Sequence, residues 1–177
     1  MGFDVYGMKP KQNTNPTDAE KYPLYSIIQQ MEWSDGMDLL DSMEEDDTKQ
    51  YWKEYNDYED ANPGTYFRNN VWWWRPLWEY TCHECQDFIS DDDIKHGAYN
   101  DGHKYSATKA KKMAKRLQDA IDKGRVKKYE KEWTLDQEKL SESDDKETKF
   151  MSNYPFSEEN VKRFIAFLKE CGGFQIC

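Results

Sequence analysis

Two cysteines and two histidines are the residues whose types best suit metal binding. Cys82 and Cys85 form a C-x2-C pair, and His96 and His103 follow after ten and then six intervening residues. A structural zinc site needs four nitrogen or sulfur ligands arranged as a tetrahedron. The match to a zinc finger is loose, because the usual finger spaces its two histidines more closely. The sequence therefore leaves two interpretations open: a zinc site, or thiols that pack as small hydrophobic side chains.

The same cysteines are candidates for nucleophilic chemistry, which needs a nearby base and a lowered thiol pKa. His83 directly follows Cys82. Neighbouring residues on a helix point about 100° apart, so these two side chains do not form a dyad by sequence alone. Cys171 and Cys177 offer a rival pair to complete a metal site. Since Gly-rich phosphate loops, G-x-S-x-G and H-E-x-x-H are all lacking, we predict no catalytic residue and, as cofactor, either none or one zinc ion.

The stretch 66–78, YFRNNVWWWRPLW, holds four of the seven tryptophans beside two arginines and two asparagines. If 65–71 is a strand, Arg68 and Asn70 share one face and are able to hold a carboxylate or phosphate, while tryptophans stack on a planar ring. The candidate pocket residues are Arg68, Asn70, Trp72, Trp74 and Arg75, with Asn100, Asp101 and His103 from a following turn. The alternative is that both arginines pair with carboxylates or stack on the tryptophans in a rigid core.

Charge is distributed unevenly along the chain, whose formal net charge is −10. Residues 35–60 carry eleven acidic and two basic side chains, whereas residues 104–131 carry eleven basic and three acidic ones. Asp38, Asp41, Glu44 and Glu45 lie on the polar side of an expected helical stretch. Closely spaced carboxylates of this kind can imitate the phosphates of nucleic acid in a partner's basic groove. Ordinary solvent exposure is the competing explanation.

Lysines line one side of the helix expected after Ser106, and this side could follow a phosphate backbone. Its basic residues are Lys109, Lys111, Lys112, Lys115 and Arg116. A pI near 4.8 argues against general nucleic-acid binding. Direct binding to nucleic acid is therefore not expected, and a solvated face is the simpler interpretation.

Length and composition indicate one cytosolic domain with an aromatic core. The 177 residues are 37% hydrophobic and 34% charged, but aromatic residues reach 15%, too many for a disordered chain. The start has no basic and apolar leader pattern, and no run of about 18 apolar residues appears. We expect a cytoplasmic location and no membrane partner.

Hydrophobic periodicity predicts the elements of the first half. Residues 3–7 alternate like a strand, residues 9–23 form a polar loop, and apolar spacing over 24–33 and 37–43 indicates helices. A stripe of tyrosines over 51–58 indicates another helix that ends before Pro63. We expect a strand over 65–71 that runs through the tryptophans into a helix, with Pro76 in its first turn and the helix ending at Asp91–Asp93 and Gly97.

The second half of the sequence predicts two clear helices. Ser106 caps one that stops at Gly124, and Ser157 caps another that stops at 172–173. Residues 125–150 are highly charged and indicate a partly helical polar segment. Residues 174–177 alternate again and are expected to pair with strand 3–7. The predicted fold is α+β, a small antiparallel or mixed sheet packed with several helices in a single domain over residues 1–177.

Four short motifs together resemble a group of uncharacterised proteins of phages and bacteria. They are GFDVYG at 2–7, YFRNNVWWWRPLW at 66–78, YNDG at 99–102 and GGF at 172–174. The resemblance covers both ends and the middle of the chain and leaves out the acidic and lysine-rich stretches. It implies a phage or bacterial cytosolic setting, with segments 9–60 and 125–150 as insertions of this member. It implies no activity, since none is known for the group.

Two functions remain open from the sequence. The first is an acidic, non-catalytic protein that binds a macromolecular partner of host or phage, expected to be a protein, with nucleic-acid mimicry as one version. The second is a small-molecule or nucleotide-binding protein or enzyme that uses the pocket of Arg68, Asn70 and the tryptophans.

Overall fold

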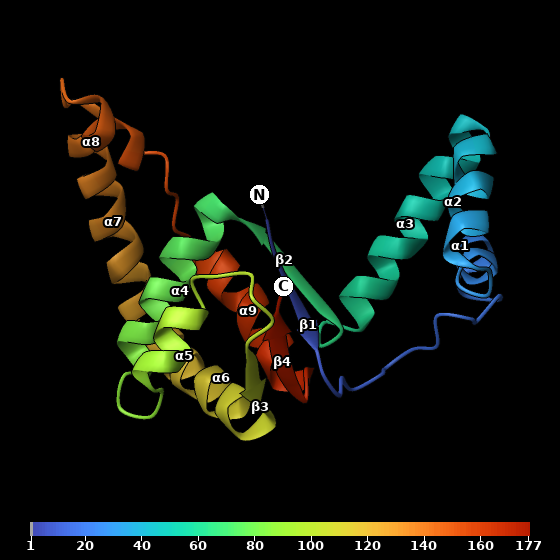
Figure 1. The fold of residues 1–177 in the computed structure, drawn as a ribbon, viewed down its shortest axis with the longest axis horizontal. Helices are drawn as coiled ribbons and strands as arrows, with labels where there is room; N and C mark the ends of the chain where they lie inside the picture. Colours follow the sequence, from blue (N-terminus) through green and yellow to red (C-terminus); the bar gives the residue numbers. More distant parts are fainter. Residues whose placement is uncertain (1) are drawn as a thin grey trace. The chain divides into compact units, whose positions relative to one another are not determined.

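The computed structural model describes residues 2–177, and the chain forms two compact units (Figure 1). Unit 1 comprises residues 2–10 and 64–177, and unit 2 comprises residues 11–63. The predicted α+β class is confirmed. The sequence predicts a single domain over residues 1–177. Within the chain, residues 11–63 bury a small core of their own and form the second of the two units.

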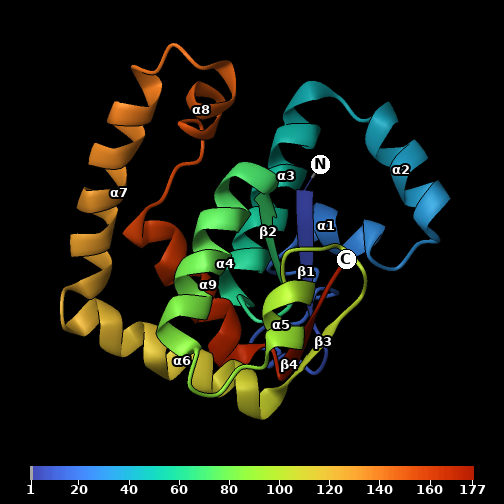
Figure 2. The same ribbon diagram turned by 60° about the vertical axis from the view of Figure 1, so that its left-hand side comes forward.

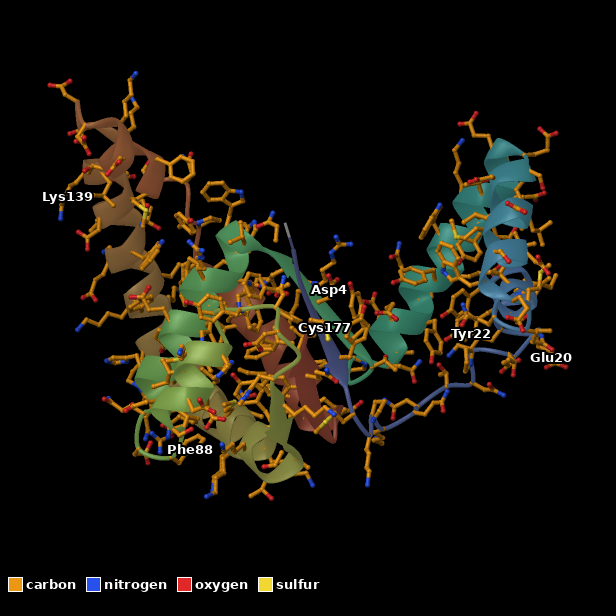
Figure 3. The ribbon with its side chains drawn as sticks, viewed as in Figure 1. Asp4, Glu20, Tyr22, Phe88, Lys139 and Cys177 are labelled. Carbon is orange, nitrogen blue, oxygen red and sulfur yellow. The ribbon has the colours of Figure 1, made fainter. Side chains whose placement is uncertain are left out.

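Unit 1 contains a four-stranded sheet with the order β2-β1-β4-β3. Its strands are β1 (Gly2–Gly7), β2 (Tyr66–Asn70), β3 (Lys104–Ser106) and β4 (Gly173–Ile176). Every pairing is antiparallel, which decides between the two sheet types that the sequence left open. The expected pairing of the last strand with the first is confirmed: Asp4 and Cys177 exchange backbone hydrogen bonds of 3.0 and 2.8 Å, and Figure 3 labels both residues.

Three helices cover one face of this sheet, as both ribbon views show (Figures 1 and 2). They are α4 (Val71–Cys85), α6 (Ala107–Asp122) and α9 (Glu158–Glu170). Alternation along β1 sends Phe3 and Val5 into the core beneath them, while Asp4 and Tyr6 point to the other face. The core is aromatic, as the composition predicts, and the rings of Tyr105 and Phe174 stack at 4.4 Å across β3 and β4.

Helix α4 begins inside the tryptophan stretch, and the prediction that the strand continues through the tryptophans is wrong. Strand β2 ends at Asn70, whose side-chain oxygen accepts hydrogen bonds of 3.1 Å from the backbone N–H groups of Trp72 and Trp73. An asparagine at the N-cap satisfies N–H groups that otherwise lack a partner in the first turn. Pro76 therefore lies inside the helix, beyond its first turn.

The acidic triplet that follows begins a helix and does not end one. Helix α4 stops at Cys85, and α5 (Asp91–His96) is a separate short helix. Ser90 caps it reciprocally: the Ser90 hydroxyl accepts from the Asp93 N–H at 3.2 Å, and the Asp93 carboxylate accepts from the Ser90 N–H at 2.9 Å. Carboxylates are stabilised at a helix N-terminus, which explains why the triplet starts a helix.

The charged segment 125–150 is more helical than expected. It forms α7 (Arg125–Ser141) and the start of α8 (Lys146–Met151). The anchors are Val126, which is fully buried, and Trp133, whose indole N–H donates to the Tyr154 carbonyl at 2.7 Å. None of the helices among residues 2–177 combines the length and apolar character that crossing a bilayer requires.

Unit 2 consists of α1 (Pro23–Ile28), α2 (Trp33–Ser42) and α3 (Glu45–Ala61) around a core of tyrosines. Tyr25 contacts the rings of four other tyrosines at centroid distances of 5.2–6.2 Å. The apolar face predicted for 24–33 is therefore only partly correct, since Ile27 and Met31 are exposed. Tyr22, labelled in Figure 3, is buried instead.

A buried carboxylate joins two helices of unit 2. Glu54 of α3 accepts hydrogen bonds of 2.8 and 2.9 Å from the backbone N–H groups of Leu24 and Tyr25. These are first-turn N–H groups of α1, which has no side-chain cap of its own. Glu54 thus replaces the missing cap and fixes α1 on α3.

Unit 2 is an insertion between two neighbouring strands. Strands β1 and β2 pair directly, with Tyr6 opposite Tyr66, and the Gly7 N–H donates to the Thr65 carbonyl at 2.9 Å. A short turn usually joins such strands, yet here 53 residues, 11–63, lie in the connection. Insertions between adjacent ends of a complete fold are tolerated because the host keeps its own core.

Candidate functional site

Arg68 does not line the predicted pocket. It lies on the exposed face of β2, as the strand alternation predicts, with its side chain 65% exposed. Its Nε is 3.5 Å from Oδ1 of Asp4 on the paired strand, and the Tyr66 hydroxyl donates to the same Asp4 oxygen. Arg68 therefore has a carboxylate partner, but the pair lies on the exposed face of the sheet and not in the rigid core that the second alternative describes.

Asn70 and the tryptophans have structural contacts. Asn70 is the N-cap of α4, Trp72 packs against Tyr154 at 4.8 Å between ring centroids, and Trp74 is fully buried. Arg75 donates to the Tyr154 hydroxyl at 3.1 Å. A hollow of about 410 Å³ does lie beside this stretch, but its lining residues are Trp74, Arg75, Trp78, Glu79, Cys82, Ile94, Ala98 and Tyr99. Arg68, Asn70, Trp72 and His103 do not line it.

The capping role of Asn70 leads to a prediction that separates it from Arg68. Asn70→Ala is expected to lower the free energy of unfolding by about 1 kcal/mol, because two N–H groups of α4 lose their acceptor. Arg68→Ala is expected to change it by less than about 0.5 kcal/mol, since exposed ion pairs contribute little. Urea denaturation monitored by circular dichroism measures both, and an equal loss in the two variants would contradict this assignment.

The turn after α5 brings His96 and His103 together with carboxylates. The rings of His96 and His103 stack with centroids 4.8 Å apart and planes 10° apart. Nδ1 of His96 is hydrogen-bonded to Asp101, and its Nε2 lies 3.3 Å from Oδ1 of Asp92. The Asp101 carboxylate also accepts from the His103 backbone N–H at 3.1 Å. Asn100, the other predicted turn residue, donates instead to the Gly2 carbonyl at 2.6 Å.

Asp93 anchors this histidine cluster to the interior. Its side chain is only 3% exposed and contacts Lys109, the Ser90 hydroxyl at 2.7 Å and Nε2 of His103 at 3.2 Å. Burial alone would raise the pKa of Asp93, but the hydrogen bonds from Lys109, Ser90 and His103 outweigh it and hold the pKa well below its ordinary value. Asp93 therefore stays ionised and holds His103 in place.

Hydrogen bonds within the cluster also shift the pKa values of its more exposed members, His96 and Asp101. The hydrogen bond that His96 donates to the Asp101 carboxylate raises the pKa of His96 and lowers the pKa of Asp101. Three carboxylates contact the two imidazoles: Asp92 and Asp101 contact His96, and Asp93 contacts His103. The cluster therefore favours positive charge, whether a proton or a metal cation supplies it.

The cysteines do not join the histidines. Among residues 2–177, the side chains close enough to share a metal are Asp92, His96 and His103. Cys85 is fully buried in the core, and burial raises the pKa of Cys82 and of Cys85 to about 12. A thiol must lose its proton to act as a ligand or nucleophile. Cys171 is also buried, and Cys177 lies at the exposed end of the chain.

The lysine-rich face of α6 is divided between structural contacts and solvent. Lys109 pairs with Asp93, and Arg116 forms two hydrogen bonds of 2.9 Å to Asp87. Lys111, Lys112 and Lys115 are exposed. Two of the five predicted phosphate-binding side chains thus have carboxylate partners within the protein.

The four carboxylates chosen from the acidic stretch are exposed and lie within unit 2. Asp38 and Asp41 share one side of α2, and Glu44 and Glu45 follow at the start of α3, all four being exposed. Lys49 partly neutralises Glu45 at 2.7 Å. Residues 11–63 carry fourteen acidic and four basic side chains, a net charge of −10, whereas acidic and basic residues balance at twenty-one each in the rest. Unit 2 therefore carries the whole formal net charge of the protein.

Exposed tryptophans accompany these carboxylates. Trp33, the first residue of α2, is 82% exposed, and Trp52 of α3 is 47% exposed. Sequence reasoning assigned no role to Trp33, and no local pattern marks it, because apolar spacing alone does not show which helix residues remain uncovered. Tryptophan is enriched at the energetic centres of protein interfaces. It is depleted on ordinary surfaces, so its exposure here favours a binding surface.

Sequence reasoning also did not identify Asp92 and Asp93 as members of the histidine cluster. The signal was present, since Ser90 and Asp93 have capping-box spacing and Asp92 precedes His96 by one helical turn.

Comparisons with protein-family models, curated proteins and solved structures found no match to this chain. The resemblance to phage and bacterial proteins therefore remains a hypothesis, and function rests on the geometry.

Proposed function

We propose that the protein binds a basic macromolecular partner through unit 2, without catalysing a reaction. The observation that carries the proposal is the concentration of the whole net charge of −10 in 53 residues that also expose two tryptophans. Complementary charge accelerates encounter and selects partners, while large aromatic side chains supply affinity. The partner class is a protein with a basic surface, of a phage or its bacterial host. The proposal needs no cofactor.

Nucleic-acid mimicry is the specific version of this proposal. Asp38 and Asp41 are one turn apart on α2 and are followed directly by Glu44 and Glu45, so the carboxylates succeed one another along the chain. A basic groove that binds phosphates accepts closely spaced carboxylates for the same electrostatic reason. If this version is correct, double-stranded DNA competes with the protein for the captured partner.

The test is affinity capture from a bacterial lysate with quantitative mass spectrometry. The variant D38N/D41N/E44Q/E45Q is compared with a control that removes four exposed carboxylates from unit 1, E138Q/E142Q/D144N/E147Q. Each lost surface contact costs roughly 0.5 kcal/mol, so the first variant is expected to bind the partner roughly thirtyfold more weakly. The control is expected to bind like the natural chain.

Two results would count against the proposal. Partner capture that is equal for both variants would mean that the acidic surface of unit 2 is not the contact. Capture that persists unchanged at high salt would exclude a charge-driven contact, because exposed charges are screened within about 10 Å at 0.1 M salt. If unit 2 binds the partner but DNA does not displace it, the binding function stands and nucleic-acid mimicry is rejected.

A further inference from the structure

The histidine cluster belongs to unit 1 and has its own chemistry. Its three side chains come from α5 and from the segment that leads into β3. Their ligand atoms lie within 4.8 Å of one another. Two imidazoles and one carboxylate are a common donor set for zinc, with the remaining coordination position left to water.

We propose that Asp92, His96 and His103 bind a zinc ion. Tetrahedral zinc with nitrogen ligands at about 2.05 Å requires ligand atoms about 3.4 Å apart. Nε2 of His96 and Oδ1 of Asp92 are already separated by 3.3 Å. The ligand atom of His103 lies within 4.8 Å of the other two. It therefore needs a shift of up to about 1.4 Å to reach the zinc geometry, which rotation of this partly buried side chain supplies.

Hydrogen bonds to the other imidazole nitrogens support this assignment. In metal sites, a histidine usually donates its second ring N–H to a carboxylate, which fixes the ring and its tautomer. Here Nδ1 of His96 is bonded to Asp101, and Nε2 of His103 is bonded to the buried Asp93. These contacts leave Nε2 of His96 and Nδ1 of His103 for the metal. Asp93 and Asp101 are thus positioning residues and not ligands.

Exposure indicates an open site. The side chain of Asp92 is 71% exposed, and those of His96 and His103 are 32% and 21% exposed. Solvent therefore reaches the fourth coordination position. The ion would link α5 to the segment entering β3, because its ligands His96 and His103 are seven residues apart in the sequence. Binding to the folded state alone would also raise the melting temperature of unit 1.

The test begins with the full chain, dialysed against a chelator and titrated with zinc by calorimetry. One equivalent is expected to bind, and no stoichiometric binding would overturn the proposal. His96→Ala is expected to abolish this binding, whereas His83→Ala, which changes the exposed third histidine, is expected to leave it unchanged. Unchanged binding by His96→Ala, or loss in His83→Ala, would overturn the ligand set.

Two further measurements distinguish roles within the cluster. Asp101→Asn is expected to weaken zinc binding about tenfold to a hundredfold while keeping one equivalent, as removal of a positioning carboxylate does. Cobalt substitution of the natural chain is expected to give visible bands of a tetrahedral nitrogen and oxygen site. A thiolate-to-cobalt charge-transfer band would show that Cys82 or Cys85 is a ligand and would overturn the assignment without needing any variant to fold.

Discussion

Trp74→Ala is expected to lower the free energy of unfolding by about 3–5 kcal/mol. Trp74 has no exposed surface and stacks between Phe3 at 5.4 Å and Trp78 at 5.6 Å. Its indole N–H also donates to the Gly97 carbonyl at 2.8 Å, so the substitution leaves both a large cavity and an acceptor without its donor. Chemical denaturation followed by far-UV circular dichroism measures the change.

Trp33→Ala is the matched control for this change. The residue type and the substitution are the same, but Trp33 is 82% exposed. The expected change is less than about 0.5 kcal/mol. If Trp74→Ala cost as little as Trp33→Ala, the tryptophan stretch would not be the core element that we describe, and its rings would be available for ligand binding after all.

Asp93→Ala is expected to lower the free energy of unfolding by about 3 kcal/mol. The change removes the partner of Lys109 and of His103 and deletes half of the Ser90 capping box. Breaking a buried ion pair costs about 3–5 kcal/mol, and the lower end applies because the Lys109 side chain is 35% exposed. The loss is measured by urea denaturation with a chelator present, so that bound metal does not contribute.

The neighbouring Asp92→Ala provides the comparison, since it lies in the same short helix but is 71% exposed. Under the same conditions it is expected to change stability by less than about 0.5 kcal/mol. A double-mutant cycle of Asp93→Ala with Lys109→Met isolates the interaction energy between Asp93 and Lys109. A coupling energy near zero would show that Lys109 does not stabilise Asp93.

Much of unit 1 follows from local sequence patterns. Alternation at 3–7 and 174–177, with the Ser106 and Ser157 caps, predicts two paired strands and two helices that the structure contains. The start of α4 was misplaced because tryptophans are compatible with strand and helix alike, so Asn70 as the N-cap decides the boundary. Strand β3 is only three residues long and has too few positions to show a period.

The second unit and the candidate metal site depend on contacts that periodicity does not describe. The core of unit 2 consists mainly of tyrosines, whose polar hydroxyls weaken the apolar pattern. The sequence therefore does not show that residues 11–63 bury a core of their own. The sequence predicts His96 and His103 as metal ligands together with Cys82 and Cys85, because spacing does not show which helix face is buried. Asp92 reaches the histidines because α5 begins at Asp91, a start that the capping box sets.

The amount of partner retained by a chain without unit 2 tests directly whether unit 2 is the binding module. Residues 11–63 are replaced by a short Asn-Gly linker, which together with residues 8–10 and 64–65 closes a short loop between the antiparallel strands β1 and β2. We predict that this chain keeps the near-UV circular dichroism of the tryptophan core and retains almost none of the partner captured by the full chain. Capture equal to that of the full chain would show that unit 2 is not the binding module.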